Sequence, residues 1–377
     1  MTIYCGVDFH ARQRTVYYCD AADGAIQLAE LDHQEDDVRG FYSTFTGEVT
    51  VWLEASGYST WFVELVEGLG HKVLVGDASE IRRLAKRRQK NDRRDATLIL
   101  DLLLRGEFPQ VHRPPFESRE VLRRLRYRHK LVQMRTRAKN SLQALAFSAG
   151  WAGRSRLLSR AGREQFLRLQ MSEAMGRQRE EWLSLVDELN ARIKSLDGWL
   201  TERANSDERV LRLQTHPGVG LLTSLALVHG LEPVSRFMGG RMVAVYVGLD
   251  PMEYSSGDKQ RYGSISEGGS RLLRYLLVEA AQITVRRDEG LKRFYLCLLR
   301  ATAVQKAQVA VARKLLIRCY ILLRDGIDYA EFLRRGVEAR PARLATYASM
   351  PGVSDWAAGL SCGRVRNGPH GRECPDR

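Results

Sequence analysis

The 377-residue sequence predicts an α/β domain followed by a longer, mainly helical remainder. Over roughly the first hundred residues, short β-branched and aromatic runs alternate with amphipathic segments, a pattern typical of an α/β sheet. Pro114 and Pro115 then interrupt the pattern. Between Phe116 and His216 there is no proline, and apolar residues recur at three- and four-residue steps, which predicts long helices.

The N-terminal elements are expected in a defined order. Three strands come first, separated by turn residues such as Asp23 and Gly24. A helix, a buried strand, a helix, another strand and two helices follow, and this is the element order of ribonuclease H-like folds. The expected strands are residues 3–8, 15–20, 25–31, 49–54 and 72–75, and the expected helices are residues 36–45, 60–69, 80–90 and 92–104.

Two apolar stripes with coiled-coil-like spacing mark the middle of the chain. Such stripes suit either the core of one helical bundle or a seam between two chains, and the sequence leaves both open. The chain is expected to turn around residues 151–160. One stripe contains Leu122, Leu125, Leu131, Met134, Ala138, Leu142 and Leu145, and the other contains Trp182, Leu185, Leu189, Ile193, Leu196 and Leu200.

These patterns divide the chain into four parts. Residues 1–110 are expected to form the ribonuclease H-like domain, and residues 116–205 a basic, helical, coiled-coil-like region. Residues 206–330 are expected to form a mainly helical C-terminal domain. Residues 336–377 show no clear periodicity and are expected to be an irregular tail without an assigned function.

Charge is segregated along the sequence. The formal net charge is +14, but residues 1–80 carry 14 acidic and 4 basic side chains, whereas residues 81–140 carry 6 acidic and 19 basic ones. A carboxylate-containing site beside a phosphate-binding surface would account for this order. A chance skew between two faces of the molecule is the alternative.

The composition argues against several classes of protein. A hydrophobic content of 44% excludes a wholly disordered chain. No apolar run approaches the ~18 residues of a membrane span, and the first residues lack the pattern of a signal peptide. Six cysteines are scattered without a C-x-x-C pair, which argues against a disulfide framework or a zinc site. We therefore expect a cytoplasmic protein, associated with the nucleoid when it binds DNA, and no membrane partner.

Four carboxylates are candidates for a metal site. Asp8 and Glu54 each end an apolar strand, at the edge where open α/β sheets place their sites. Asp92 and Asp95 are three residues apart and share one face of a helix start. In a ribonuclease H-like topology these positions converge, and the four charges would repel each other unless Mg²⁺ or Mn²⁺ neutralised them. Taken singly, each residue also has an ordinary structural interpretation: Asp8 as a turn residue and Asp92 as a helix N-cap.

The C-terminal domain contains two turns of interest. The Pro217-Gly218-Val219-Gly220 turn resembles a helix-hairpin-helix, whose backbone N–H groups at Gly218 and Gly220 could hold a phosphate; a plain tight turn is the alternative. Further on, Ser255-Ser256-Gly257 is by itself a loop signal. The sequence has neither a Ser-His-Asp order nor a G-x-S-x-G elbow, so a hydrolase triad is not supported.

Arginine and lysine are dense in two predicted helical segments, residues 81–90 and 119–139. In the second segment, Tyr127 and His129 are interleaved with the basic residues and could stack on bases. This density favours nucleic acid over a merely solvated face, although DNA and structured RNA fit equally. The candidate nucleic-acid-binding side chains are Arg82, Arg83, Lys86, Arg87, Arg88, Arg123, Arg124, Arg126, Arg128, Lys130, Arg135 and Arg137, with Arg271 and Arg274 in the C-terminal domain.

Seven short motifs resemble one known family. GVDFH, WLEASG and KNDRRDA are similar to the N-terminal DEDD domain of insertion-sequence-110 family transposases, which are also described as bridge-RNA-guided recombinases. PGVG, YVGLDP, SSG and ISEGGSRLLRYLL are similar to the serine domain of the same family. The sequence departs from that family at Glu267, where lysine is usual.

The resemblance implies a function for the matched residues. Asp8, Glu54, Asp92 and Asp95 would hold Mg²⁺ or Mn²⁺, and Ser256 would be the nucleophile, with Ser255 as the neighbouring alternative. The implied activity is transposition through a phosphoserine link, with donor and target DNA, a structured guide RNA, and a homo-oligomer (dimer or tetramer). Two other readings stay open: a junction-resolvase-like metal nuclease, and a nucleic-acid-binding protein without catalysis.

Overall fold

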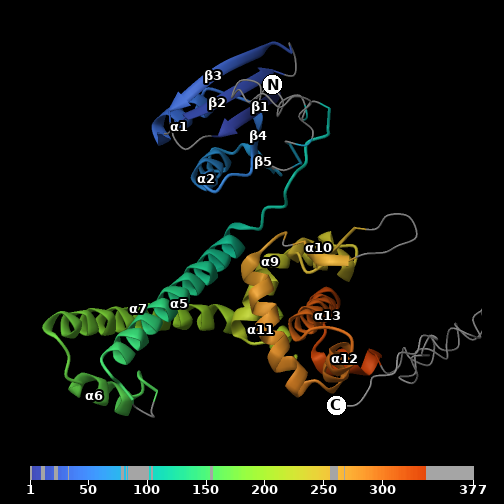
Figure 1. The fold of residues 1–377 in the computed structure, drawn as a ribbon. Helices are drawn as coiled ribbons and strands as arrows, with labels where there is room; N and C mark the ends of the chain where they lie inside the picture. Colours follow the sequence, from blue (N-terminus) through green and yellow to red (C-terminus); the bar gives the residue numbers. More distant parts are fainter. Residues whose placement is uncertain are drawn as a thin grey trace, which may run out of the picture. The chain divides into compact units, whose positions relative to one another are not determined.

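The computed structural model describes residues 2–9, 13–20, 24–32, 34–77, 80–81, 83, 102, 105–152, 156–254, 262–266 and 268–336. The chain forms two compact units, Met1–Arg113 and Pro114–Arg377, which are described separately below (Figure 1). The predicted helices 80–90 and 92–104 lie largely outside the described residues, and the predicted tail lies outside them beyond Gly336.

The first unit contains a five-stranded mixed sheet with the order β3-β2-β1-β4-β5. Antiparallel pairs join β1, β2 and β3, whereas β1, β4 and β5 run parallel. Every strand predicted from the sequence is present within one or two residues. The elements are β1 (Thr2–Phe9), β2 (Gln13–Asp20), β3 (Ile26–Asp32), α1 (Glu35–Ser43), β4 (Glu48–Glu54), α2 (Thr60–Gly68) and β5 (Lys72–Gly76).

The two faces of this sheet bury different residues because side chains alternate along each strand. Helices α1 and α2 cover one face, where Val7 and Leu53 pack with Phe62. The opposite face carries a smaller aromatic cluster around Trp52, which stacks on Tyr4 at 5.8 Å between ring centroids. Successive residues at the end of each strand therefore point alternately to the helix-covered face and to the aromatic face.

The second unit begins with a long helical hairpin, in which α5 (Phe116–Ser148) and α7 (Glu173–Asn205) run antiparallel. Ion pairs Glu117–Arg203 and Arg128–Asp197 fix this direction. Helix α6 (Arg160–Arg168) packs at the hairpin end distant from α9 (Figure 1). The predicted apolar stripes meet each other inside one chain, except Met134, which is 46% exposed. Intramolecular packing thus accounts for both stripes.

A mainly helical bundle completes the second unit. Its central helix α9 (Leu221–Leu231) is buried from Thr223 to Leu231, as expected for a helix that is apolar on all sides. Around it lie α8 (Glu208–Gln214), the 3₁₀ turn η1 (Val234–Arg236), α10 (Gly240–Val247), β6 (Pro251–Glu253), β7 (Tyr262–Ile265), α11 (Arg271–Arg287), α12 (Glu289–Leu299) and α13 (Val304–Asp325). The prediction of a mixed α/β domain followed by a mostly helical remainder is confirmed.

Within the described segments, no helix combines the length and the apolar character that crossing a bilayer requires.

Candidate active site and nucleic-acid interface

Asp8 and Glu54 end neighbouring parallel strands on the same face of the sheet. The register pairs Val7 with Leu53, so the next residue on each strand is one of the two carboxylates. Because Val7 and Leu53 pack under α2, Asp8 and Glu54 lie on the other, aromatic face. Adjacent strands are ~4.8 Å apart, which places the two half-buried side chains next to each other.

The chain after Glu54 is held in place by backbone hydrogen bonds. The Ala55 N–H donates to the Gly76 carbonyl at 2.9 Å, which continues the β4–β5 pairing past the carboxylate. The Ser59 hydroxyl donates to the Ser56 carbonyl at 3.0 Å, so the loop turns at once into α2. These bonds fix the position of Glu54 at the sheet edge.

Two of the four predicted carboxylates are therefore brought together by the fold. Asp92 and Asp95 lie outside the described residues. Within the described segments, no three histidine, cysteine, aspartate or glutamate side chains form a group that could hold a metal ion. Asp8 and Glu54 supply hard oxygen donors at adjacent positions, which is the ligand chemistry that Mg²⁺ and Mn²⁺ prefer.

Strands β6 and β7 pair as an antiparallel hairpin, and the predicted serines fall between them in the sequence. Ser255 and Ser256 lie outside the described residues, but the base of the hairpin is described. The Ser266 hydroxyl donates to Asp250 Oδ1 at 2.7 Å, and the Ser266 N–H donates to the Asp250 carbonyl at 2.9 Å. These two bonds join the strands where they leave the helical bundle. Sequence reasoning missed Asp250 and Ser266, because no local pattern marks their pairing.

Arg274 of α11 also stabilises the base of the β6–β7 hairpin. Its Nη1 donates to the Val247 carbonyl at 3.0 Å and to the Gly268 carbonyl. Gly248 has φ +75°, and a Cβ there would lie 2.7 Å from the Gly268 nitrogen, so only glycine fits this crossing. Arg274 was predicted to contact nucleic acid; in the structure one side of its guanidinium is used to hold the hairpin base. Arg271 is exposed at the start of α11.

The Pro217–Gly220 turn joins α8 to α9, and its two glycines have different surroundings. Gly218 has φ +90° and packs against Thr284, whose hydroxyl donates to the Pro217 carbonyl at 3.0 Å. Gly220 precedes α9, and a Cβ there would meet nothing within 4 Å. The position of Gly218 reflects tight packing, whereas a side chain at Gly220 would meet open space.

His216 directly precedes this turn, and its side chain is buried in the second unit. The ring is buried and contacts the Tyr329 ring at 4.3 Å between centroids. Burial lowers the pKa of His216 to about 4, so the ring is neutral near pH 7. It therefore serves packing and does not add positive charge for nucleic acid.

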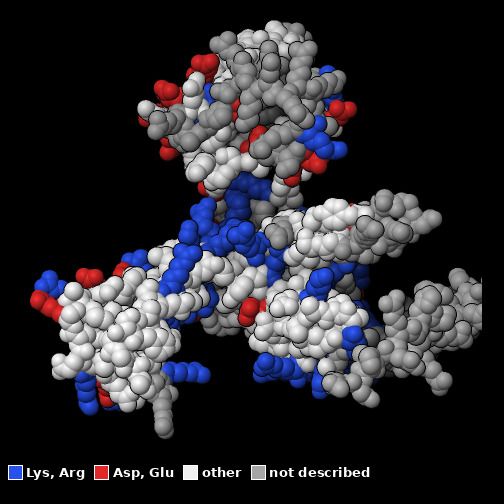
Figure 2. All heavy atoms as spheres, viewed as in Figure 1, with Lys and Arg blue, Asp and Glu red and all other residues white. Residues whose placement is uncertain are grey.

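Basic side chains line α5 (Figure 2). Arg126, Lys130 and Arg137 are exposed. Others are held by neighbours on α7: Arg128 binds Asp197, Arg135 donates to Asn190 at 3.1 Å, and Arg124 lies 3.9 Å over the Trp199 ring. Arg123 pairs with Glu120, and Arg83 pairs with Glu80, each at 2.7 Å. The predicted contacts Arg82, Lys86, Arg87 and Arg88 lie outside the described residues.

The two aromatic candidates on α5 differ in accessibility. Tyr127 is 48% exposed and available for stacking. His129 instead contacts Tyr275 of α11 at 4.7 Å between ring centroids, and burial lowers the pKa of its imidazole. His129 thus contributes to the α5–α11 contact.

Two family models match the chain. One, described as a transposase of the DEDD type of IS110 elements, matches residues 5–147, and the other, described as the transposase IS116/IS110/IS902 family, matches residues 210–296. Together they cover more than half of the chain, including both carboxylate strands and the serine hairpin. The chain belongs to the IS110 family of transposases.

Similar proteins have the same character. The transposase for insertion sequence element IS1111A of Coxiella burnetii is 27% identical over 70% of this chain and 74% of its own length. A protein of Pseudomonas aeruginosa described as "Probable family 20 transposase" is 28% identical over 82% of this chain and 93% of its own length. The transposase for element IS1328 of Yersinia enterocolitica is 27% identical over 63% and 72%. IS110-family transposases are enzymes that cleave and recombine DNA, and DNA is their substrate.

Proposed function

We propose that this transposase exchanges DNA strands through a phosphoserine intermediate on Ser256, assisted by a divalent metal site at Asp8, Glu54, Asp92 and Asp95. The observation that carries the proposal is the position of Asp8 and Glu54, which directly follow the paired residues Val7 and Leu53 on adjacent parallel strands. The order and mixed direction of the strands support a ribonuclease H-like fold for this domain.

The residues at this edge fit a divalent ion. Asp8 and Glu54 lie on adjacent strands and on one face of the sheet, so one hard cation would accept oxygen donors from both. A bound Mg²⁺ or Mn²⁺ would supply charge stabilisation at the reacting phosphate and activation of the attacking oxygen. Asp8 and Glu54 would hold that ion in a fixed position, because Asp8 pairs with Thr15 of β2 and Glu54 pairs with Gly76 of β5.

The serine would act as a nucleophile on DNA. Its oxygen forms a bond to phosphorus as the bond from phosphorus to a deoxyribose oxygen breaks, and the leaving oxygen takes up the proton. Attack by a hydroxyl of the second DNA strand then releases the serine and joins the strands. Arg274 and the Asp250–Ser266 pair would set where the hairpin with Ser256 emerges.

Basic residues on α5 and α11 would bind the phosphate backbone of the donor and target DNA. The exposed residues Arg126, Lys130, Arg137 and Arg271 are suited to this contact. A structured guide RNA would pair with both DNAs, and a homo-oligomer, dimer or tetramer, would combine the metal domain of one chain with the serine domain of another. These partners follow from the family resemblance.

A junction assay tests the proposal. Purified protein, element DNA, guide RNA and Mg²⁺ are incubated with a target plasmid, and joined donor–target products are amplified and sequenced. We expect joined products that disappear when EDTA is added. Cleaved but unjoined DNA would instead identify a metal nuclease, and intact DNA with metal-independent binding would identify a binding protein without catalysis.

A further inference from the structure

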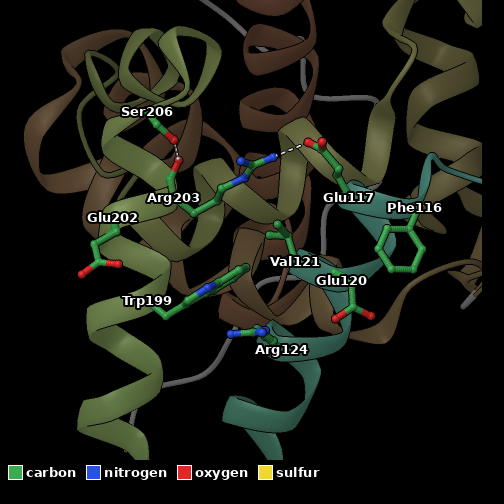
Figure 3. A pocket seen from close by; sticks show the side chains of 9 residues that line it. All are labelled: Phe116, Glu117, Glu120, Val121, Arg124, Trp199, Glu202, Arg203 and Ser206. Carbon is green, nitrogen blue, oxygen red and sulfur yellow. Dashed lines mark hydrogen bonds and ion pairs between the residues drawn. The ribbon is translucent and has the colours of Figure 1, made fainter.

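A pocket of about 600 Å³ lies between the first turns of α5 and the last turns of α7 (Figure 3). Val121 forms part of its lining on α5, and Trp199 and Arg203 project toward it from α7. The Arg203–Glu117 ion pair spans it at 2.5 Å. All lining residues belong to the second unit, and the volume lies in the range of small-ligand sites.

The pocket combines aromatic rings with fixed polar groups. The Arg124 guanidinium lies 3.9 Å over the Trp199 ring, which makes one wall flat and rigid. Phe116, at the start of α5, is 58% exposed, and the guanidinium carbon of Arg119 lies 5.6 Å from its ring centroid. Much of the Phe116 ring is therefore free to stack on a planar ligand.

The hydrogen-bonding groups of the pocket are mostly acceptors. Glu117, Glu120 and Glu202 line it together with two arginines. Arg203 pairs with Glu117, and Arg124 lies over Trp199. Glu120 holds Arg123 at 2.7 Å in a partly solvent-exposed ion pair of the kind that contributes little to stability, so a ligand can displace it. An anionic group such as a phosphate is therefore disfavoured inside the pocket. A planar ligand with several N–H donors along one edge is favoured.

The surroundings of the pocket suit a nucleic-acid chain. Phe116 and Glu120 are four residues apart and lie on one side of α5. Arg123, Arg126 and Lys130 continue along the same helix at steps of three and four residues. A base that stacks on Phe116 would present its edge to Glu120 and replace Arg123 there. The released Arg123 and the cations of the following turns would then meet the flanking phosphates.

We propose that this pocket binds an unpaired guanine base of a single-stranded nucleic acid. Guanine presents two neighbouring donors, N1–H and the N2 amino group, which match a carboxylate such as Glu120, whereas uracil and thymine present only one. A base within a duplex is inaccessible to the pocket. The inference rests on the proposed nucleic-acid function of α5, and it applies equally to an RNA loop or a displaced DNA strand.

Fluorescence anisotropy with labelled nonamers tests this inference. The probes are RNA with one central guanine among uridines, all-uridine RNA, and the corresponding DNA with thymidines. We expect the protein to prefer the guanine-containing probes. Phe116→Ala should weaken their binding about fivefold or more, because stacking on an aromatic ring contributes at least that much per base. Glu120→Gln should remove the preference for guanine.

The matched control is Phe147→Ala. Phe147 is on the same helix and 59% exposed, but it is not part of the pocket. This variant should bind both probes like the parent protein. Equal losses of binding affinity in Phe116→Ala and Phe147→Ala, or no loss in either, would overturn the proposal that the pocket binds a base. A guanine preference that persists in Glu120→Gln would overturn the assignment of Glu120 as the group that recognises the guanine edge.

The outcome also separates this inference from the function on which it rests. If the protein binds duplex element DNA but shows no preference for guanine among the nonamers, only the proposed guanine pocket is overturned. A protein that binds neither the nonamers nor element DNA overturns the nucleic-acid function and the pocket together. The RNA and DNA probes decide which strand supplies the base.

Discussion

Asp8→Asn is expected to reduce DNA strand cleavage at least ~100-fold while sparing DNA binding, because a metal contribution of several kcal/mol corresponds to more than two factors of ten in rate. Asparagine keeps the shape of the side chain and removes its charge. Glu54→Gln should have a similar effect, because both carboxylates occupy the same sheet edge. Cleavage of labelled element DNA, quantified on a denaturing gel beside a filter-binding assay, measures the two properties separately.

The first unit offers matched controls for both changes. Asp20 pairs with Ile3 and Glu48 pairs with Thr2, so both lie at the opposite end of the sheet from the candidate site. Asp20→Asn and Glu48→Gln should therefore retain cleavage. If these controls lose as much activity as Asp8→Asn, the effect comes from net charge or folding, and the metal site is refuted.

Gly218→Ala is expected to destabilise the second unit by about 2–5 kcal/mol, from the strain of a left-handed backbone and the steric overlap combined. A Cβ at this position would lie 2.7 Å from the Thr284 nitrogen and 2.9 Å from its Cα. Because these are backbone atoms of α11, they cannot move aside as a flexible side chain could. Urea unfolding followed by circular dichroism measures the loss.

Two further variants test whether backbone overlap at Gly218 is the cause of the expected destabilisation. Gly220→Ala places a Cβ in open space and should cost less than ~1 kcal/mol. Thr284→Ala combined with Gly218→Ala should not restore stability, since the backbone overlaps remain. A Gly218→Ala protein as stable as the parent would mean that the turn does not pack on α11 as described.

Periodicity and strand ends made much of the first unit predictable. Asp8 and Glu54 were recognisable because each follows a run of apolar residues, and the strand register then places them side by side. Their shared face depends on the pairing of Val7 with Leu53, which no local pattern specifies. The apolar stripes of α5 and α7 were likewise visible, but whether they meet within one chain depends on the antiparallel packing.

Long-range contacts account for what the sequence did not predict. Arg274 was expected at a phosphate because it is basic and begins a helix, yet it donates to the carbonyls of Val247 and Gly268. Ser118 and His229 are 111 residues apart, and their buried hydrogen bond between α5 and α9 has no counterpart in the sequence pattern. Such pairs are created by the packing of distant segments.

A protein–DNA adduct assay tests the central claim most directly. The protein is incubated with end-labelled element DNA, guide RNA and Mg²⁺, and denatured before electrophoresis. The account predicts a labelled band at the size of the protein plus DNA, abolished by Ser256→Ala and retained in the adjacent control Ser255→Ala. An adduct that persists in Ser256→Ala, or strand exchange without any adduct, would contradict the phosphoserine mechanism.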